Sequence, residues 1–414
     1  MSSNEPKGQG FRTGLNEGTL GLTMAAILLF TAVIWAAHSP NVEKADFSLT
    51  YVGAMLVHSD LGSRLYDIEL QKQTRDTLFQ HPSPLLFEHP PFEALIFAPL
   101  AHFSYRTAYM IWGLANATIW FVLVIVMRSH LHWPREDLGY IVLWFLFAPI
   151  GVALYQGQSS ILLLGVYAAC FLQLRRGNDF LAGLLLAVGL IKLQFVLAFF
   201  LIFLMRKKWY LVSGFVTSTV CLTFLSILTV GWRGIVEYGR FLIAIGSHPN
   251  NVSFGSGVDM PTIHGFVFAT MGHWLSPYVL QVLVAGASLA LLGWVAWRWN
   301  SLESQTGSDL MFASAISASL LAGSHMFTHD FSPLLLAMFI VGAELTSVQT
   351  AAARRRLRIV LVPFWAFPVY FLCVVCHCMF LLCPILLLFT WVAAESARNA
   401  TRSHTDQLEL AVNG

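Results

Sequence analysis

Long apolar runs separated by short polar connections dominate the pattern of this chain. A helix that crosses the hydrocarbon core of a bilayer at a right angle needs about 20 apolar residues, and several of these runs are shorter. We therefore expect an all-α polytopic membrane protein with about twelve transmembrane helices, some of them short or broken. The apolar runs lie at roughly 19–38, 106–128, 138–155, 158–174, 180–191, 193–205, 209–230, 276–297, 309–323, 331–346, 358–376 and 379–394.

The composition supports this prediction. The 414 residues are 57% hydrophobic and only 11% charged, and the mean hydropathy is +0.66. A soluble domain carries about 25% charged residues, so a chain this apolar needs lipid as its solvent. Because no basic stripe is interleaved with aromatic residues, we expect no nucleic-acid partner.

Lys192 marks a break in the apolar segment from Phe180 to Met205. If this segment were one helix, the charge would sit at mid-bilayer, at a cost of about 2.5–3.5 kcal/mol on insertion scales. A helix that ends at Lys192 places the charge at a membrane surface instead. The sequence therefore predicts two short helices on either side of Lys192.

The basic residues decide the orientation of the helices. With a break at Lys192, the basic clusters all fall on the side of the N-terminus, which the positive-inside rule assigns to the cytoplasm. We predict an inner (plasma) membrane protein with both termini in the cytoplasm. It consists of an N-terminal segment 1–18, a transmembrane domain 19–397 and a disordered tail 398–414. The clusters are Arg128–Arg135, Arg175–Arg176, Arg206–Lys208, Arg298, Arg354–Arg358 and Arg398.

The same topology turns two long connections outward, 39–105 and 231–275. Within the first, the segment from Pro90 to Phe103 is apolar, but it is too short to span a bilayer and three prolines interrupt it. We expect it to form a juxtamembrane helix on the outer surface.

Polar and ionisable residues gather on this outward side. A carboxylate at the membrane boundary can act as a general base, and lysine or histidine can neutralise a phosphate leaving group. Any one of these residues can also be an ordinary loop residue; Lys192 and the turn 325–330 give the strongest signals, because charged groups beside apolar helices are costly. The group includes Asp46, Glu88, His89, Gln158, Lys192, His325, His329 and Asp330.

Six short motifs, in order, resemble one family. They are Asp46–Tyr51 with Leu65–Asp67, His89–Phe92 with Ala98–Leu100, Ile111–Trp112 with Asn116, Gly157–Ser159, Ile191–Lys192 with Arg206–Trp209, and His329–Asp330. Together they resemble the polyprenyl-phosphate-dependent mannosyltransferases of glycosyltransferase family 87. The resemblance extends over residues 46 to 340.

The resemblance implies a GT-C-type fold with a catalytic aspartate in the first outer loop. Asp46 would be the general base that activates an acceptor hydroxyl for inverting transfer of a hexose, with mannose as the first choice. The donor would be a polyprenyl-phosphate sugar and the acceptor a glycolipid or cell-envelope glycan, with no metal or other cofactor. Lys192 would stabilise the leaving phosphate. Further contacts to the donor phosphate or the acceptor are expected from Tyr51, His89, Gln158, His325, His329 and Asp330.

The chain departs from the family pattern at two places. His89 stands where family members more often have an aromatic residue before the two prolines, and Leu193-Gln194 rather than proline follows Lys192. These departures bear on the identity of the sugar more than on the class of reaction.

Two alternatives remain open at this point. A secondary transporter would explain broken helices with a charged residue at the break, although the chain shows no internal repeat. A non-catalytic lipid-linked scaffold would make Asp46 dispensable.

The run Cys373–His377 matches the haem-attachment pattern C-x-x-C-H, but its apolar surroundings favour membrane-buried thiols.

Overall fold

The computed structural model describes residues 17–80, 84–131, 138–247, 257–302, 304–344 and 351–413, and no strand occurs among them. The chain is therefore all-α, as predicted. Its helices are α1 (Glu17–Ala37), α2 (Phe47–His58), α3 (Ile68–Leu78), α4 (Pro91–Phe97), α5 (Tyr105–His130), α6 (Leu138–Leu146), α7 (Ala148–Gln156), α8 (Ser160–Arg175), α9 (Asp179–Val188), α10 (Leu193–Met205), α11 (Trp209–Ser247), α12 (Ile263–Met271), α13 (Pro277–Asn300), α14 (Gln305–Leu321), α15 (Leu334–Glu344), α16 (Ala351–Trp365), α17 (Phe367–Val375) and α18 (Leu382–Asn413).

Several helices can cross a membrane. By length and composition, six segments of the described residues qualify, or seven if the bent pair formed by α16 and α17 counts as one span. The chain is thus a multi-pass membrane protein, as the apolar pattern predicts. The predicted number of about twelve crossings stays a prediction, because α6 to α10, α14 and α15 are shorter than the bilayer requires.

The chain reverses direction at Lys192. A straight helix over the 27 residues from Asp179 to Met205 would be about 40 Å long. Yet Lys208 Nζ, just beyond its far end, lies 3.6 Å from Asp179 Oδ2. A 3₁₀ turn, η4 (Gly189–Lys192), separates α9 from α10 at this point. The predicted break at Lys192 is therefore present, and α9 and α10 form a hairpin with Lys192 at its tip.

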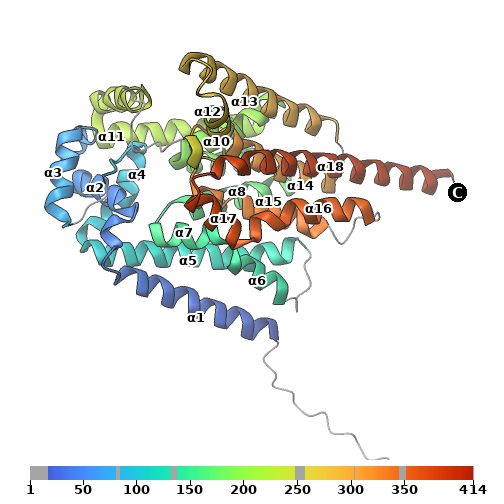
Figure 1. Ribbon diagram of the computed structural model, residues 1–414, viewed down its shortest axis with the longest axis horizontal. Coiled ribbons are helices and arrows are strands. Elements are labelled where there is room, and N and C mark those ends of the chain that lie inside the picture. The colour runs from blue at the N-terminus through green and yellow to red at the C-terminus, as the bar shows by residue number, and fades with distance from the viewer. Residues whose placement is uncertain are drawn as a thin grey trace, which may run out of the picture.

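Charged residues gather at the end of the helix bundle away from this tip. In Figure 1, α1 begins and α18 ends on the same side of the molecule, opposite to α2, α3 and α4. Ion pairs join the helix ends there, and most of their basic members belong to the clusters that determined the predicted orientation. They are Lys208–Asp179, Arg175–Asp309 at 3.6 Å and Arg298–Glu395 at 2.6 Å.

The long connection after α1 folds into a helical cap on the other end of the bundle. The cap consists of α2, α3, α4 and the segments between them (Figure 1). Gln71 holds it together from inside, because its buried side-chain amide donates to Leu65 O and Phe87 O and accepts from Phe87 N. The segment from Pro90 to Phe103 contains a helix, α4; its location at the membrane surface stays a prediction.

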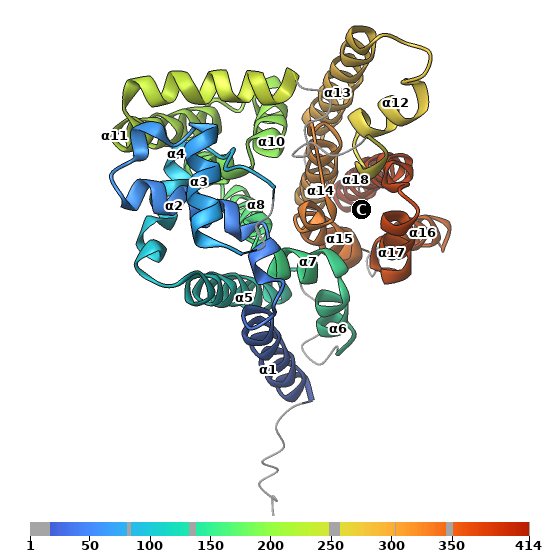
Figure 2. The same cartoon turned by 60° about the vertical axis from the view of Figure 1, so that its left-hand side comes forward.

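The prediction of a loop over 231–275 was wrong for much of its length. Gly231, with a φ of 71°, redirects the chain, and α11 then continues to Ser247. Figure 2 shows α11 passing over the cap. This part of α11 is stabilised by an apolar face that packs on the cap. Phe241 is buried in the core of the cap, and Ile235 and Tyr238 pack against that core.

The expected disorder of the tail after Arg398 was also wrong, since α18 continues to Asn413. Contacts beyond the last apolar turn hold this helix. Thr401 Oγ1 lies 2.8 Å from Ser304 Oγ, at the start of α14. The polar residues after Arg398 predicted disorder, but they continue a helix that this contact anchors to the start of α14.

Glycines allow α9 and α11 to pack closely. A Cβ atom on Gly183 would lie 2.0 Å from Leu211 O, and one on Gly214 would lie 2.0 Å from Phe180 O. Small residues at such a crossing let two membrane helices approach each other at backbone distance. This contact fixes the first arm of the hairpin that carries Lys192.

We expect Gly183→Ala to lower the free energy of unfolding of the purified protein by about 1–3 kcal/mol, because the added methyl group overpacks the crossing of α9 and α11. The matched control is Gly286→Ala in α13, where a Cβ would meet nothing within 4 Å. That change should leave stability unchanged or raise it by up to about 1 kcal/mol. Thermal unfolding in detergent measures both, and equal melting temperatures would contradict the close crossing.

Candidate active site

A cavity of about 190 Å³ lies between the cap and the end of the helix bundle that carries Lys192. Its polar lining comes from the start of α2, the segment before α4, the turn between α7 and α8, the tip of the α9–α10 hairpin and the turn between α14 and α15. The charged and polar lining residues are Asp46, Glu88, His89, Gln158, Lys192, Gln194, Tyr238, Ser324, His325, His329 and Asp330.

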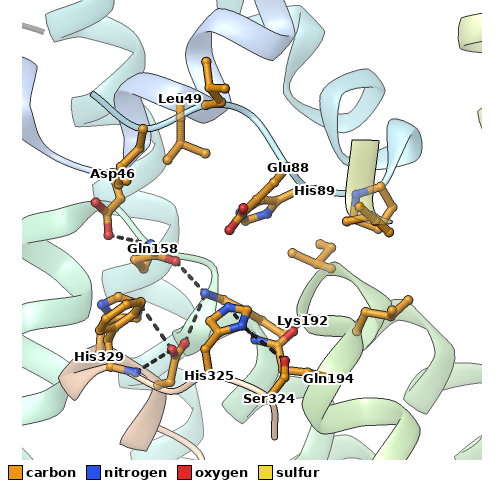
Figure 3. A pocket seen from close by; sticks show the side chains of 18 of the residues that line it. Asp46, Leu49, Glu88, His89, Gln158, Lys192, Gln194, Ser324, His325 and His329 are labelled. Carbon is orange, nitrogen blue, oxygen red and sulfur yellow. Dashed lines mark hydrogen bonds and ion pairs between the residues drawn. The ribbon is translucent and has the colours of Figure 1, made fainter. Parts of the chain in front are cut away.

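A chain of hydrogen bonds crosses this cavity (Figure 3). Gln158 Nε2 donates to Asp46 Oδ2 at 2.7 Å, and Lys192 Nζ donates to Gln158 Oε1 at 2.8 Å. Lys192 Nζ also lies 3.1 Å from Asp330 Oδ1. Because a carboxylate only accepts and an ammonium only donates, the amide of Gln158 can take one orientation alone. It joins the candidate base to the candidate phosphate-binding group.

Asp330 is almost fully buried, with 2% of its side chain exposed. Besides Lys192, Ser160 Oγ donates to its Oδ1 at 3.0 Å and the Phe327 backbone N–H donates to its Oδ2 at 3.1 Å. His329 Nε2 lies 3.4 Å from Oδ2. A buried charge persists only when it is paired and hydrogen-bonded, and Asp330 meets both conditions. Its first role is to hold Lys192.

The turn between α7 and α8 requires a glycine before Gln158. Gly157 has a φ of 63°, the left-handed conformation that glycine adopts at helix ends. A Cβ atom there would also lie 2.7 Å from Phe47 Cβ. Trp112 Nε1 donates to Gly157 O at 2.8 Å and fixes the turn from α5. The Gly-Gln-Ser motif thus has a structural cause.

Asp46 directly precedes α2, beside this turn. Its backbone N–H donates to Gln156 Oε1 at 3.1 Å, while Gln158 occupies carboxylate oxygen Oδ2. The other carboxylate oxygen has no hydrogen-bond partner among the residues that the structure describes. Asp46 is therefore held in position and keeps one oxygen available for a substrate.

The opposite side of the cavity belongs to the segment before α4. Figure 3 shows Glu88 and His89 across the cavity from Lys192 and His325. His89 Nδ1 lies 2.6 Å from Glu93 Oε2, and Glu93 is 1% exposed. Burial lowers the pKa of His89, but the charge of Glu93 and this hydrogen bond outweigh burial and raise it overall. Burial raises the pKa of the Glu88 carboxyl.

His325 lies beside Gln194, whose Nε2 is 3.2 Å from the Nε2 of the imidazole. Burial lowers the pKa of His325 to about 4, so the ring is neutral at pH 7. A neutral ring can hydrogen-bond a phosphate, and positive charge in this cavity comes first from Lys192.

The structure brings seven of the eight predicted site residues together. Tyr51 is the exception: its hydroxyl donates to Phe103 O at 2.6 Å, and its ring is buried in the core of the cap. It lies one helical turn past Asp46 on a helix that is buried along most of its length, so its place in a motif reflects packing. Tyr51 does not line the cavity, and its contact with a substrate stays a prediction.

Sequence reasoning placed Glu88 among the outward polar residues without a specific role, noted Gln194 only as a departure from the family pattern, and did not single out Glu93. Glu88 and Glu93 flank the Pro90-Pro91 pair and Gln194 follows Lys192 by two residues. The motifs give their neighbourhood, but only the fold shows that Glu88 and Gln194 line the cavity and that Glu93 holds His89.

A second cavity, of about 470 Å³, adjoins the first and shares Ser324 with it. Its walls are α10, α12, α13 and the end of α14, and they are mainly apolar. Leu197 and Leu289 line it and are also exposed at the outer surface of the helices. The second cavity therefore lies next to the first and opens at the exposed outer surface of these helices. His264 also lines this second cavity.

The sequence model of glycosyltransferase family 87 matches residues 87–324, more than half of the chain. The chain belongs to this family. It is accordingly a membrane glycosyltransferase, with a sugar donor and an acceptor as substrates. No curated protein and no solved structure gave a significant match.

The matched region and the cavity overlap only in part. Glu88, Gln158 and Lys192 lie inside the match, whereas Asp46 and the turn His325–Asp330 lie outside it. The fold brings both sets to one place. Within the described part of the chain, no group of three or more His, Cys, Asp or Glu side chains is arranged to hold a metal ion; metal independence stays a prediction.

We expect Lys192→Met to lower stability by about 3–5 kcal/mol, because it leaves the buried Asp330 carboxylate without its ion-pair partner. Adding Asp330→Asn to this variant should restore part of the loss. The matched control is Lys208→Met. Lys208 is 42% exposed, and its partner Asp179 is 25% exposed and 3.6 Å away, so this change should cost at most about 1 kcal/mol. Melting temperatures measure all three, and equal losses for both lysines would contradict a buried pair.

Proposed function

We propose that this glycosyltransferase inverts the anomeric configuration and moves a hexose, with mannose as the first candidate, from a polyprenyl-phosphate sugar. The acceptor is a glycolipid or a cell-envelope glycan. The reaction takes place on the outer face of the inner (plasma) membrane, with both termini in the cytoplasm. One observation carries the proposal: a carboxylate and an ammonium group, Asp46 and Lys192, share one cavity and are held apart by Gln158.

The reaction needs a base on one side of the sugar and a phosphate site on the other. The acceptor oxygen forms a bond to the anomeric carbon, and its proton passes to Asp46. The bond between the anomeric carbon and the phosphate oxygen breaks, and its electron pair leaves with the lipid phosphate. Because attack and departure occur on opposite faces of the carbon, the configuration inverts.

The phosphate would lie beside Lys192. An ammonium has three donors, and two of them are engaged with Gln158 and Asp330. The third is available to a phosphate oxygen, and the polar groups of Gln194 and His325 stand next to it. Charge-assisted hydrogen bonds of this kind stabilise the negative charge that develops on a leaving group.

The second cavity supports a lipid-linked donor. A polyprenyl chain is apolar, and it needs a path from the bilayer to the phosphate site. The cavity of about 470 Å³ between α10 and α13 meets the first cavity at Ser324 and has leucines exposed at its mouth. A donor could then leave its chain in lipid while its phosphate and sugar enter the site.

Family membership weighs against the two alternatives. A secondary transporter would move its substrate without any polyprenyl lipid, and a scaffold would not need the carboxylate of Asp46. Only a transferase needs the Asp46 carboxylate for sugar transfer, so replacing this carboxylate and measuring transfer tests the proposal directly.

We expect Asp46→Asn to reduce transfer of radiolabelled mannose from polyprenyl-phosphate mannose to a membrane-lipid extract by about 10²–10⁴-fold, because an amide cannot accept the proton. The fold should remain, since an amide oxygen can still accept from Gln158. Asp60→Asn is the matched control: it makes the same chemical change on the exposed surface just after α2 and should leave transfer unchanged.

Undiminished transfer by Asp46→Asn would contradict the assignment of Asp46 as the base, but it would not affect the assignment to the family. If the wild type transfers no mannose, the donor sugar is different, and a panel of other polyprenyl-phosphate sugars decides the donor class.

A further inference from the structure

Glu88 is a buried ionisable group that the proposed reaction does not use. It lies between two residues whose backbones are fixed. Phe87 is bonded through both N and O to the buried side chain of Gln71. On the other side, Tyr66 Oη donates to His89 O at 2.7 Å. The backbone at Glu88 is therefore held by the cap at a set distance from the helix bundle.

The side chain of Glu88 lines the cavity and has no hydrogen-bond or ion-pair partner within the described residues. Figure 3 shows its carboxyl group directed into the space opposite Lys192. The charged groups that act on it are His89, Lys192 and Asp46. A carboxyl group in this position, without a protein partner, leaves its hydrogen-bonding capacity to whatever enters the cavity.

The cavity, of about 190 Å³, has room for a sugar ring. The phosphate belongs beside Lys192, so the ring attached to it extends toward the opposite side of the cavity, where Glu88 is placed.

We propose that Glu88 hydrogen-bonds a hydroxyl group of the transferred hexose and so selects the donor sugar. This inference rests on the proposed function. Hexoses that differ in the configuration of one hydroxyl have the same size, so shape alone separates them poorly. A buried polar group that one epimer satisfies and another leaves unpaired separates them far better.

The surroundings favour a hydrogen-bonding role over that of a base. Gln158 and the backbone bond to Gln156 hold Asp46 in place, whereas no hydrogen bond or ion pair from the described residues orients the carboxyl of Glu88. Burial also raises the pKa of Glu88, which favours the neutral form that can both donate and accept. A glutamine has the same size and the same two capacities, so it should replace Glu88 but not Asp46.

The test compares donors that differ only in the sugar. Wild type, Glu88→Ala and Glu88→Gln are assayed for kcat/KM with polyprenyl-phosphate mannose, glucose and galactose. Glu88→Ala should lower kcat/KM for the preferred donor by about tenfold or more and for at least one epimer by less than about threefold. Glu88→Gln should stay within about threefold of wild type. Glu69→Ala, an exposed glutamate of α3 in the same cap, is the control.

Three results would overturn the proposal. Glu88→Ala could leave kcat/KM unchanged, or it could lower kcat/KM equally for all donors, which would indicate a merely structural role. Glu88→Gln could also lose as much activity as Asp46→Asn, which would make Glu88 the base.

If the wild type transfers none of the three sugars, the proposed donor class fails, and binding then tests Glu88 separately. Calorimetry with mannose 1-phosphate should show binding by wild type that is about tenfold weaker for Glu88→Ala. Equal affinity, or no binding to either protein, would count against Glu88.

Discussion

The buried pair of Lys192 and Asp330 is the interaction on which the site depends. Its two members come from the tip of the α9–α10 hairpin and from the turn before α15, and its lysine continues through Gln158 to Asp46. An unpaired charge at this depth costs several kcal/mol. The tip of the α9–α10 hairpin and the turn before α15 therefore stabilise each other, because each supplies the partner of the other's buried charge. The pair stabilises the fold and limits the charge left for a substrate, since Asp330 offsets much of the positive charge of Lys192.

The two sides of the cavity are made by different parts of the molecule. The helix bundle supplies mainly hydrogen-bond donors, through Lys192 and Gln194, and the cap supplies carboxyl groups, through Asp46 and Glu88. A glycosyl phosphate has the matching polarity, with acceptor oxygens at one end and hydroxyl groups at the other. Under the proposed function, this division explains why the enzyme has a folded cap: without the cap, the proposed phosphate site would face solvent with no candidate base opposite.

Much of this arrangement could be predicted from the sequence. The break at Lys192 followed from the cost of a charge in the bilayer, and the family motifs indicated Asp46, Gln158 and Lys192 as site residues. Only the fold shows that these three residues share one cavity. Periodicity failed where a helix is polar on one face or bent: residues 232–247 and the end of α18 were not recognised as helical. Tyr51 lay inside a motif for reasons of packing, and Glu88 had no signal of its own. Contacts between the cap and α11 depend on tertiary structure that no local pattern encodes.

The distances along the chain between the site residues have a consequence for biosynthesis. Asp46 and Gln158 are 112 residues apart, and Ser160 and Asp330 are 170 apart. Helices enter the membrane in order from the N-terminus, so the first half of the chain is already inserted while Asp330 has yet to be made. Contacts of such high sequence separation form late. A chain that ends before Asp330 therefore contains Asp46 and Lys192 without the carboxylate that holds Lys192, and its site is incomplete until synthesis has passed Asp330.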